Sequence, residues 1–532
     1  MQQVEKWGLF EVSSRGKSDG NPFRDYGMTV TFKGEKEEIR VNGFYDGDGV
    51  YRARFMPSYE GAYTYKVEGN FADVIENAEG AFEVVAPSEK NHGPVVVVDK
   101  THLGYADHTP YYSIGTTCYA WANQPMERQE QTLETLKNNA FNKIRFCFFP
   151  KFYEFNRKEP LTYPFERGNG EGLDPERVEQ EKSCRMRFPG MQETEQDYGF
   201  DYTRPNVEHF RRYDMRIAQL MELGIEADMI LMHPYDKWGL NEMDKDACDW
   251  YLRYVVARYG AYRNVWWSLA NEFDFIRIKT LEDWERYGQV VSSNDPFHRL
   301  LSVHNGGPNY DFSRDWVTEP SKTAELVDVI VFHDYCPTRK RMRDTLEYAK
   351  QMSEKYGKPV VWDEICYEGN IGLGWGNITG EELVRRFWEA FVRGGHCGHG
   401  ETFMDPEDIL WWSHGGILKG ESPARLRFLL DVLQDVPGGY LTKGEGIFDE
   451  VVGYAGGHVG EGWGICYDYA IHYLGVCQPT YRQLVLPEDT DYEVDVIDTW
   501  NMTITPMGVK RGICKIELPG NQYMALRVRK AG

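Results

Sequence analysis

V-W-W-S-L-A-N-E-F-D-F, residues 265–275, is an apolar run that ends in an amide and a carboxylate. Strands of a parallel sheet with helices on both faces are continuous apolar runs of this kind, and parallel barrels carry their chemistry where the strands end. We therefore expect a buried strand that presents Asn271 and Glu272 to a site. One such glutamate alone could equally be an ordinary surface residue at a strand end.

K-P-V-V-W-D-E, residues 358–364, has the same form and ends in Glu364. Cleavage of a glycosidic bond needs two carboxyl groups, one to protonate the leaving oxygen and one to attack or to activate water. Two strands that each end in a carboxylate therefore favour a glycosidase.

Apolar runs and amphipathic helical segments alternate over the middle of the chain, which is typical of βαβ units. We expect eight strands, the number that a closed (β/α)8 TIM barrel needs. They are residues 111–117, 142–148, 225–232, 265–270, 299–304, 327–333, 359–363 and about 395–403.

Both ends of the chain instead show short alternating segments separated by turns, which indicate small antiparallel β-sandwiches. We predict an N-terminal β-sandwich over residues 1–95, a catalytic barrel over 96–436 and a C-terminal β-sandwich over 437–532. The fold class is therefore α/β, a TIM barrel flanked by two β-sandwich domains.

The composition of the chain disfavours several classes of binding partner. The 532 residues carry a formal net charge of -23, which disfavours nucleic acid and anionic membranes as partners. The N-terminus lacks an apolar signal region and no later run is long enough to span a bilayer, so we expect a cytoplasmic protein. The ten cysteines have no C-x-x-C spacing, which favours free thiols. We expect neither a metal nor a cofactor, and a homo-oligomer is left open.

Polar side chains also end the other strands. Arg145 interrupts an apolar strand, and a buried charge of this kind needs a partner, for which a carboxylate on the seventh strand is suited. Histidines end the third, fifth and sixth strands, the sixth being followed by a tyrosine; these residues are His233, His304, His333 and Tyr335. Together they predict one polar rim.

The ordered set resembles the retaining glycoside hydrolases of clan A, and family five most closely. That pattern has Arg on strand two, His on strand three, Asn-Glu on strand four, His-x-Tyr on strand six and Glu on strand seven. The matching residues here are Arg145, His233, Asn271, Glu272, His333, Tyr335 and Glu364. The whole chain is similar to a group of β-glycosidases that have a sandwich domain on each side of the barrel.

This resemblance implies that Glu272 is the general acid/base and Glu364 the nucleophile. It implies that Asn271 binds the substrate 2-hydroxyl, that Tyr335 contacts the nucleophile, and that His333 supports the acid/base or binds sugar. A retaining mechanism would place the two carboxyl groups about 5 to 5.5 Å apart.

Strand eight departs from the family pattern, which has a tryptophan there as the floor for the sugar. We expect Trp411 or Trp412 to provide this floor. Glu401 could bind a sugar hydroxyl at the rim or pair with a neighbouring histidine, and we favour the rim. Trp121, soon after strand one, is a candidate for stacking on sugar and equally a candidate for the core.

Clan membership implies β-linked glycosides or the equivalent α-L-arabinosides and leaves the sugar open. A long polar segment over residues 152–203 could close one side of the cleft and favour short substrates. The absence of a signal region favours short imported oligosaccharides and exo-action. Two alternatives remain: a metal-dependent barrel hydrolase or isomerase that uses His233, His304, His333 and Glu364, and a non-catalytic carbohydrate-binding protein.

Overall fold

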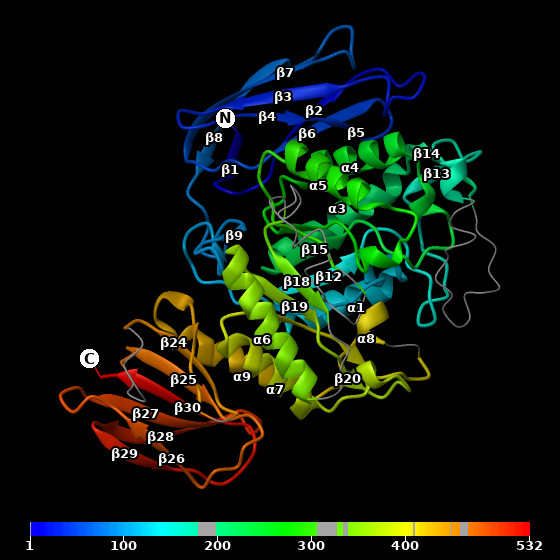
Figure 1. Ribbon diagram of the computed structural model, residues 1–532. Helices are drawn as coiled ribbons and strands as arrows, with labels where there is room; N and C mark the ends of the chain where they lie inside the picture. The colour runs from blue at the N-terminus through cyan, green and yellow to red at the C-terminus, as the bar shows by residue number, and fades with distance from the viewer. Residues whose placement is uncertain are drawn as a thin grey trace.

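The computed structural model describes residues 2–178, 198–304, 306, 327–333, 339–407, 410–447, 449–457 and 466–531. At its centre is a parallel sheet of eight strands (Figure 1). The strands are β11 (Ile114–Thr117), β12 (Lys143–Cys147), β15 (Glu226–Ile230), β16 (Val265–Ser268), β17 (Leu301–Ser302), β18 (Ile330–His333), β19 (Val360–Glu364) and β21 (His396–His399). Seven of the eight lie within the ranges predicted from the sequence, and β19 extends one residue beyond its predicted range, to Glu364.

The sheet curls into a barrel. Its strand order is β17-β16-β15-β12-β11-β21-β19-β18, so the first and last barrel strands along the chain, β11 and β21, are neighbours. The remaining gap, between β17 and β18, is bridged by Asp328, whose backbone N–H donates to Leu301 O at 2.8 Å and whose carboxylate accepts from Leu301 N at 2.9 Å. The predicted barrel is confirmed.

Helices surround this sheet (Figure 1). In α3 (Val207–Glu222), the helix that follows β12 in the barrel, buried residues recur at helical spacing from Phe210 to Leu220. Asn206 caps the start of this helix, and Gly224, with φ of 71°, follows its end. The helices of the described residues are α1 (Met126–Lys137), α3 (Val207–Glu222), α4 (Lys245–Tyr259), α5 (Leu281–Asn294), α6 (Arg339–Tyr356), α7 (Gly380–Val392), α8 (Trp411–His414) and α9 (Ser422–Gln434).

The N-terminal segment forms two sheets. Phenylalanine rings from both sheets stack between them, with centroids 3.8 Å apart for Phe10 and Phe82 and 4.4 Å apart for Phe32 and Phe55. One sheet comprises β1 (Gln2–Glu5), β8 (Glu79–Val85), β7 (Gly61–Gly69), β3 (Met28–Lys33) and β4 (Glu38–Asn42), and the other β2 (Phe10–Arg15), β6 (Val50–Phe55) and β5 (Phe44–Tyr45).

The C-terminal segment also forms two sheets, on the side of the barrel away from the first pair (Figure 1). Leu484 and Ile516 from the smaller sheet share one apolar core with Val494 and Leu526 from the larger. The larger comprises β23 (Thr442–Gly444), β24 (Val451–Ala455), β25 (Tyr469–Tyr473), β30 (Met524–Lys530), β27 (Tyr492–Asp498) and β28 (Thr503–Lys510), and the smaller β26 (Tyr481–Val485) and β29 (Ile513–Glu517).

Both flanking units are packed against barrel helices. Arg54 of β6 reaches Asp214 of α3 at 2.6 Å and the carbonyl of Arg258 of α4 at 2.7 Å. On the other side, Trp388 of α7 stacks on Tyr473 of β25, with ring centroids 5.6 Å apart. These contacts join each flanking unit to helices that surround the barrel.

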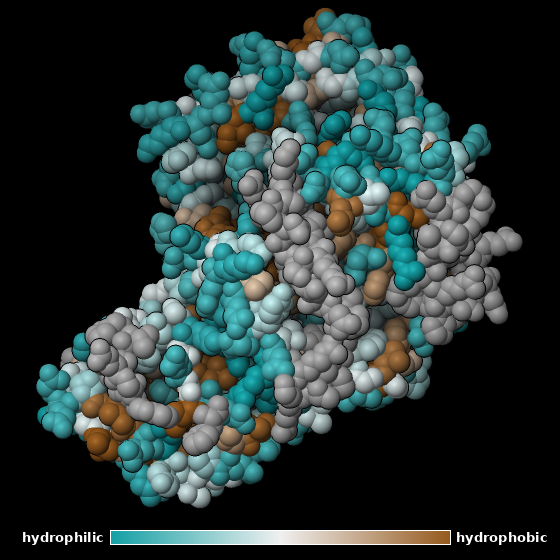
Figure 2. Space-filling model, viewed as in Figure 1, coloured by the Kyte–Doolittle hydropathy of each residue, from teal (hydrophilic) through white to brown (hydrophobic). Residues whose placement is uncertain are grey.

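Hydrophilic side chains cover most of the coloured surface in the view of Figure 2, and hydrophobic ones occur in small separate patches. Within the described ranges, no helix combines the length and the apolar character needed to cross a bilayer.

Candidate active site

Glu272 follows β16, at the carboxyl end of the barrel. Its backbone is left-handed, with φ of 50° and ψ of 52°. A residue other than glycine in this region stores strain of order 1 kcal/mol, and such residues are found most often at functional sites. The turn places Glu272 and Asn271 over the barrel, where both side chains are buried.

Glu364 is the last residue of β19. Simple alternation would send it and Asp363 to opposite faces of the strand. The register between β18 and β19 shifts at Phe332 and His333, however, and both carboxylates point into the barrel. Asp363 reaches Lys143, and Glu364 reaches Arg145, two residues further along β12. The irregularity therefore places two carboxylates inside the barrel at successive levels.

A hydrogen-bonded network fixes Glu364. Arg145 Nη1 donates to its Oε1 at 2.9 Å, and the Tyr119 hydroxyl bonds to the same oxygen. Arg145 also donates to the Tyr119 hydroxyl at 3.0 Å and to Asn271 Oδ1 at 2.8 Å. An ion pair and a hydrogen bond both stabilise the negative carboxylate, the form that a nucleophile requires.

Glu272 has a different environment. Its Oε2 accepts from Asn271 Nδ2 at 3.0 Å and from the Tyr235 hydroxyl. Burial, reinforced by the negative charge of Glu364, raises the pKa of Glu272 to about 7. The two carboxyl groups are thus distinct: one is paired with a guanidinium, and the other titrates near neutral pH.

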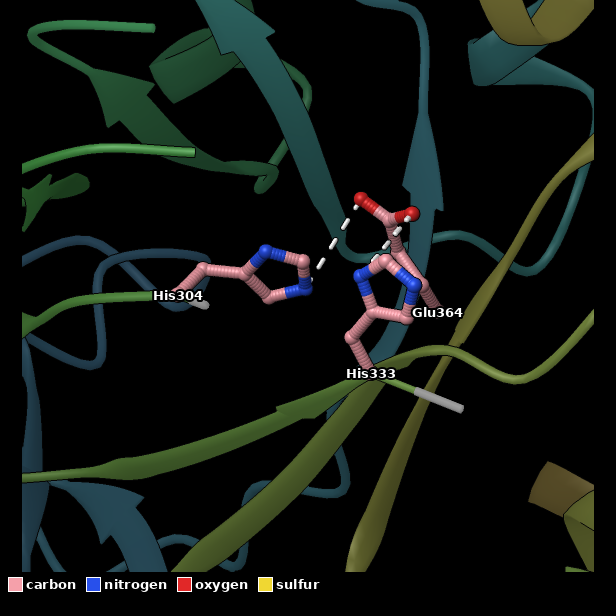
Figure 3. A group of neighbouring side chains, drawn as sticks. All are labelled: His304, His333 and Glu364. Atoms are coloured by element: carbon pink, nitrogen blue, oxygen red, sulfur yellow. Dashed lines mark ion pairs between the residues drawn. The ribbon is translucent and has the colours of Figure 1, made fainter. Parts of the chain in front are cut away.

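His333 and His304 lie side by side next to this pair. His333 Nδ1 lies 3.9 Å from Glu272 Oε1 and 3.9 Å from Glu364 Oε2, so its ring contacts both carboxyl groups. His304 Nε2 lies 3.7 Å from Glu364 Oε1, and the two imidazoles stack with centroids 5.1 Å apart (Figure 3). Burial and the nearby Arg145 hold the pKa of His304 well below its usual range, so this ring is neutral.

The donor atoms of His304, His333 and Glu364 lie within 4.8 Å of one another, close enough to hold a metal ion. The oxygen of Glu364 that faces His304 already accepts from the guanidinium of Arg145. A second cation would meet this positive charge in a buried site, whereas a neutral hydroxyl would not. The donor set therefore suits a sugar hydroxyl better than a metal.

Not every predicted rim residue contacts the carboxyl pair. His233 Nε2 bonds to Phe149 O at 3.2 Å and its Nδ1 accepts from Tyr235 N at 3.2 Å, so it orders the loop that carries Tyr235. Burial lowers the pKa of His233 to about 3. Tyr335 lies outside the described residues.

The tryptophan candidates separate into two groups. Trp412 belongs to an aromatic cluster above the pair, with ring centroids 5.3 Å from Tyr119 and 5.0 Å from Trp375. Trp411 is instead buried beside the barrel, where its Nε1 donates to Thr116 Oγ1 at 2.8 Å. Trp121 packs against Phe146 in the core.

Glu401 holds the backbone of a loop. Its two oxygens accept from Lys419 N at 2.6 Å and Gly420 N at 2.8 Å. The neighbouring Glu368 accepts from Glu421 N and Ser422 N in the same way, at the start of α9. The structure therefore ties Glu401 to the backbone rather than bringing it to the carboxyl pair.

Three residues at the pair were missed in the sequence: Tyr119, Tyr235 and Lys151. Each follows a barrel strand by two to five residues. Polar side chains just beyond strand ends are the signal that could have found them, because the loops there line the site of a parallel barrel.

Known proteins share this architecture. The family described as apiosidase-like, catalytic domain, matches residues 98–403, and domains of unknown function named DUF5060 and DUF5605 match residues 3–70 and 458–529. None of the curated protein sequences matches the chain.

A crystal structure of a candidate glycoside hydrolase from Bacteroides vulgatus is similar over 100% of both chains, with 30% sequence identity and a TM-score of 0.84. A glycoside hydrolase of family 5 from the same organism covers 82% of this chain and 93% of its own, with 15% identity and a TM-score of 0.58. At that identity the second likeness shows the fold alone. The chain belongs to the family of apiosidase-like catalytic domains and is a glycosidase of the clan A type.

Proposed function

We propose that the protein is a retaining glycoside hydrolase that acts by double displacement, with Glu364 as nucleophile and Glu272 as general acid/base. The observation that carries this proposal is the contrast between the two carboxyl groups beside His333. Glu364 is paired with Arg145 at 2.9 Å, whereas burial raises the pKa of Glu272 to about 7. An ionised and a protonated carboxyl group are the two forms that the first step consumes.

In that step Glu364 attacks the anomeric carbon while Glu272 protonates the leaving oxygen. Formation of the glycosyl-enzyme removes the negative charge of Glu364, so the pKa of Glu272 falls and it can then deprotonate the attacking water. Asn271 accepts from Arg145 and donates to Glu272, which orients its amide to bind the 2-hydroxyl.

The neutral His304 and the ring of His333 would bind other hydroxyl groups of the same sugar. Neither ring nitrogen of His304 has a hydrogen-bond partner within the described ranges. An unpaired buried imidazole nitrogen carries a desolvation cost that a bound hydroxyl would remove. Trp412 would be the floor for the sugar.

We further propose β-glycosides or α-L-arabinosides as substrates and exo-action on short oligosaccharides. Apiosides are included because the family is described as apiosidase-like. Initial rates on aryl α- and β-glycosides, with and without a chelator, test this. Chelator-insensitive cleavage of one or two β-glycosides supports the proposal. Loss of activity with chelator would favour the metal-dependent alternative, and binding without cleavage would favour a carbohydrate-binding protein.

Residues 1–95 and 437–532 are proposed to be β-sandwich domains that support the barrel over residues 96–436. Their paired sheets with shared apolar cores and their ion pairs to barrel helices support a structural role. Deleting either domain should lower the melting temperature of the barrel rather than change which glycoside it cleaves.

A further inference from the structure

Lys151 is a buried cation that the proposed reaction does not yet use. It lies in the loop after β12, and the residue is 2% exposed. Across the described ranges its ammonium group has no hydrogen-bond acceptor and no carboxylate within 4.0 Å. Lys143, in the same barrel, pairs with two carboxylates at 2.6 and 2.7 Å. A buried ammonium without an anion is unfavourable, so other groups must stabilise it.

Aromatic rings hold it. The ammonium nitrogen lies 3.4 Å from the ring centroid of Tyr119, 4.1 Å from that of Tyr235 and 4.6 Å from that of Tyr153, with Trp412 at 5.7 Å. Desolvated cation–π contacts are favourable, so three rings together offset part of the cost of burying the charge. The rings hold the ammonium without neutralising it.

This cage joins the two carboxyl groups. The hydroxyl of Tyr119 bonds to Glu364, and the hydroxyl of Tyr235 bonds to Glu272. The positive charge therefore lies between the two rings that contact the reacting groups. The titratable and charged groups that interact with it are Glu272, Glu364, Arg145, Cys147, His233, Tyr119, Tyr153, Tyr235 and His304.

Arg145 already pairs with Glu364, whereas burial raises the pKa of Glu272 and the charge of Lys151 acts in the opposite direction on that group. We propose that Lys151 is a positioning residue whose aromatic-held charge stabilises the ionised form of Glu272, the form that activates water in the second step. The proposal rests on the assignment of Glu272 as acid/base. Burial lowers the pKa of Lys151 itself to about 8, which leaves it charged at neutral pH.

The positive charge of Lys151 favours loss of the proton from Glu272. Without the cation, Glu272 would bind its proton more tightly. The alkaline limb of kcat/KM, which reports loss of that proton from the free enzyme, would move to higher pH. Hydrolysis of the glycosyl-enzyme, which needs Glu272 ionised, would become slower.

The test is Lys151→Met compared with Lys151→Arg, on an aryl glycoside with a good leaving group. We expect Lys151→Met to move the alkaline limb up by about one pH unit, the shift that one nearby charge produces. We expect kcat to fall up to roughly tenfold at acidic pH, where Glu272 of the glycosyl-enzyme is partly protonated and water activation limits such substrates, while kcat/KM at neutral pH changes little. Lys151→Arg keeps the charge, so its alkaline limb of kcat/KM should lie at the same pH as in the wild type.

Lys350→Met is the matched control: Lys350 is also a buried lysine with a lowered pKa, on α6, and should leave the pH profile unchanged. An unshifted limb in folded Lys151→Met would overturn the proposal. Disappearance of the limb would also overturn it, by assigning the titration to Lys151 itself. Glu272→Gln separates the two claims: if it keeps full activity, the acid/base assignment fails, whatever Lys151 does.

Discussion

Two groups of buried charges lie one above the other inside the barrel, and they differ in the partners that surround their charged side chains. In the lower group, the ammonium of Lys143 lies 2.6 Å from Asp228 and 2.7 Å from Asp363. In the upper group, Arg145 pairs with Glu364, but Lys151 has only aromatic rings and His304 has no hydrogen-bond partner among the described residues.

This difference indicates that the lower group serves mainly the stability of the fold and the upper group mainly the reaction. The lower ion pairs join β12, β15 and β19, so the fold itself supplies a cation to both carboxylates, and in the described structure Asp228 Oδ1 is the carboxylate oxygen of Asp228 that lacks a hydrogen-bond partner. The upper group keeps polar atoms that the fold leaves unpaired, at a cost in stability. Such atoms are available to a substrate. The comparison predicts that the lower group can be damaged without direct effect on the reaction, and the upper group without loss of the fold.

The largest expected effect is on turnover in the upper group. Glu364→Ala removes the proposed nucleophile, and kcat should fall about 10⁴-fold, or about 5.5 kcal/mol of barrier. The melting temperature should change by only a few degrees, since Arg145 keeps its hydrogen bonds to the Tyr119 hydroxyl and Asn271 and lies 3.9 Å from Asp363. A folded variant with more than about a tenth of the wild-type rate would exclude Glu364 as nucleophile.

The next effect is on stability in the lower group. Lys143→Met leaves Asp228 and Asp363 buried without their cation, so the free energy of unfolding should fall by about 3 to 5 kcal/mol. Urea unfolding measures this loss. Turnover per folded molecule, measured well below the midpoint, should change much less than in Glu364→Ala. A stable Lys143→Met variant with no turnover would remove the distinction between the groups.

A smaller effect is expected for the hydroxyl of Tyr119. Tyr119→Phe keeps the ring beside Lys151 but removes the hydrogen bond to Glu364, and kcat/KM should fall roughly 10- to 100-fold, the equivalent of one charged hydrogen bond. Tyr112→Phe is the control, because Tyr112 is buried in the same segment and its hydroxyl has no partner in the described structure. Equal losses in both variants would contradict the role of the hydroxyl.

The smallest perturbation is a change of pH. The acid must hold its proton in the free enzyme, and burial raises the pKa of Glu272 to about 7. Activity should therefore decline as pH rises through about 7, with one titrating group on the alkaline side of kcat/KM. Full activity maintained to pH 9 would show that no such acid controls the first step.

The sequence predicted the upper group in part. Glu272 and Glu364 were found because each ends an apolar strand, and Arg145 because a buried charge requires a carboxylate, which the structure places 2.9 Å away. Lys151 was missed because its neighbours come from loops after three different strands and from α8, so no local pattern marks it.

The tryptophans show a second limit of prediction from the sequence. Trp121, Trp411 and Trp412 all lie close to strand ends or loops of the barrel, and their residue type predicts stacking in each case. Only packing separates them, because Trp121 and Trp411 fill the core while Trp412 joins the aromatic cluster above the carboxyl pair. The lower group was also missed, since K-I-R and E-A-D contain charges that strand patterns assign to solvent.

Azide rescue tests the central claim most directly. An aryl glycoside that the enzyme cleaves is incubated with Glu272→Ala or Glu364→Ala and azide, and the anomeric configuration of the glycosyl azide is determined by NMR. The assignment predicts a product of retained configuration from Glu272→Ala, where azide replaces water, and of inverted configuration from Glu364→Ala, where azide replaces the nucleophile. The opposite pairing of variants and products would contradict the assignment of the two roles.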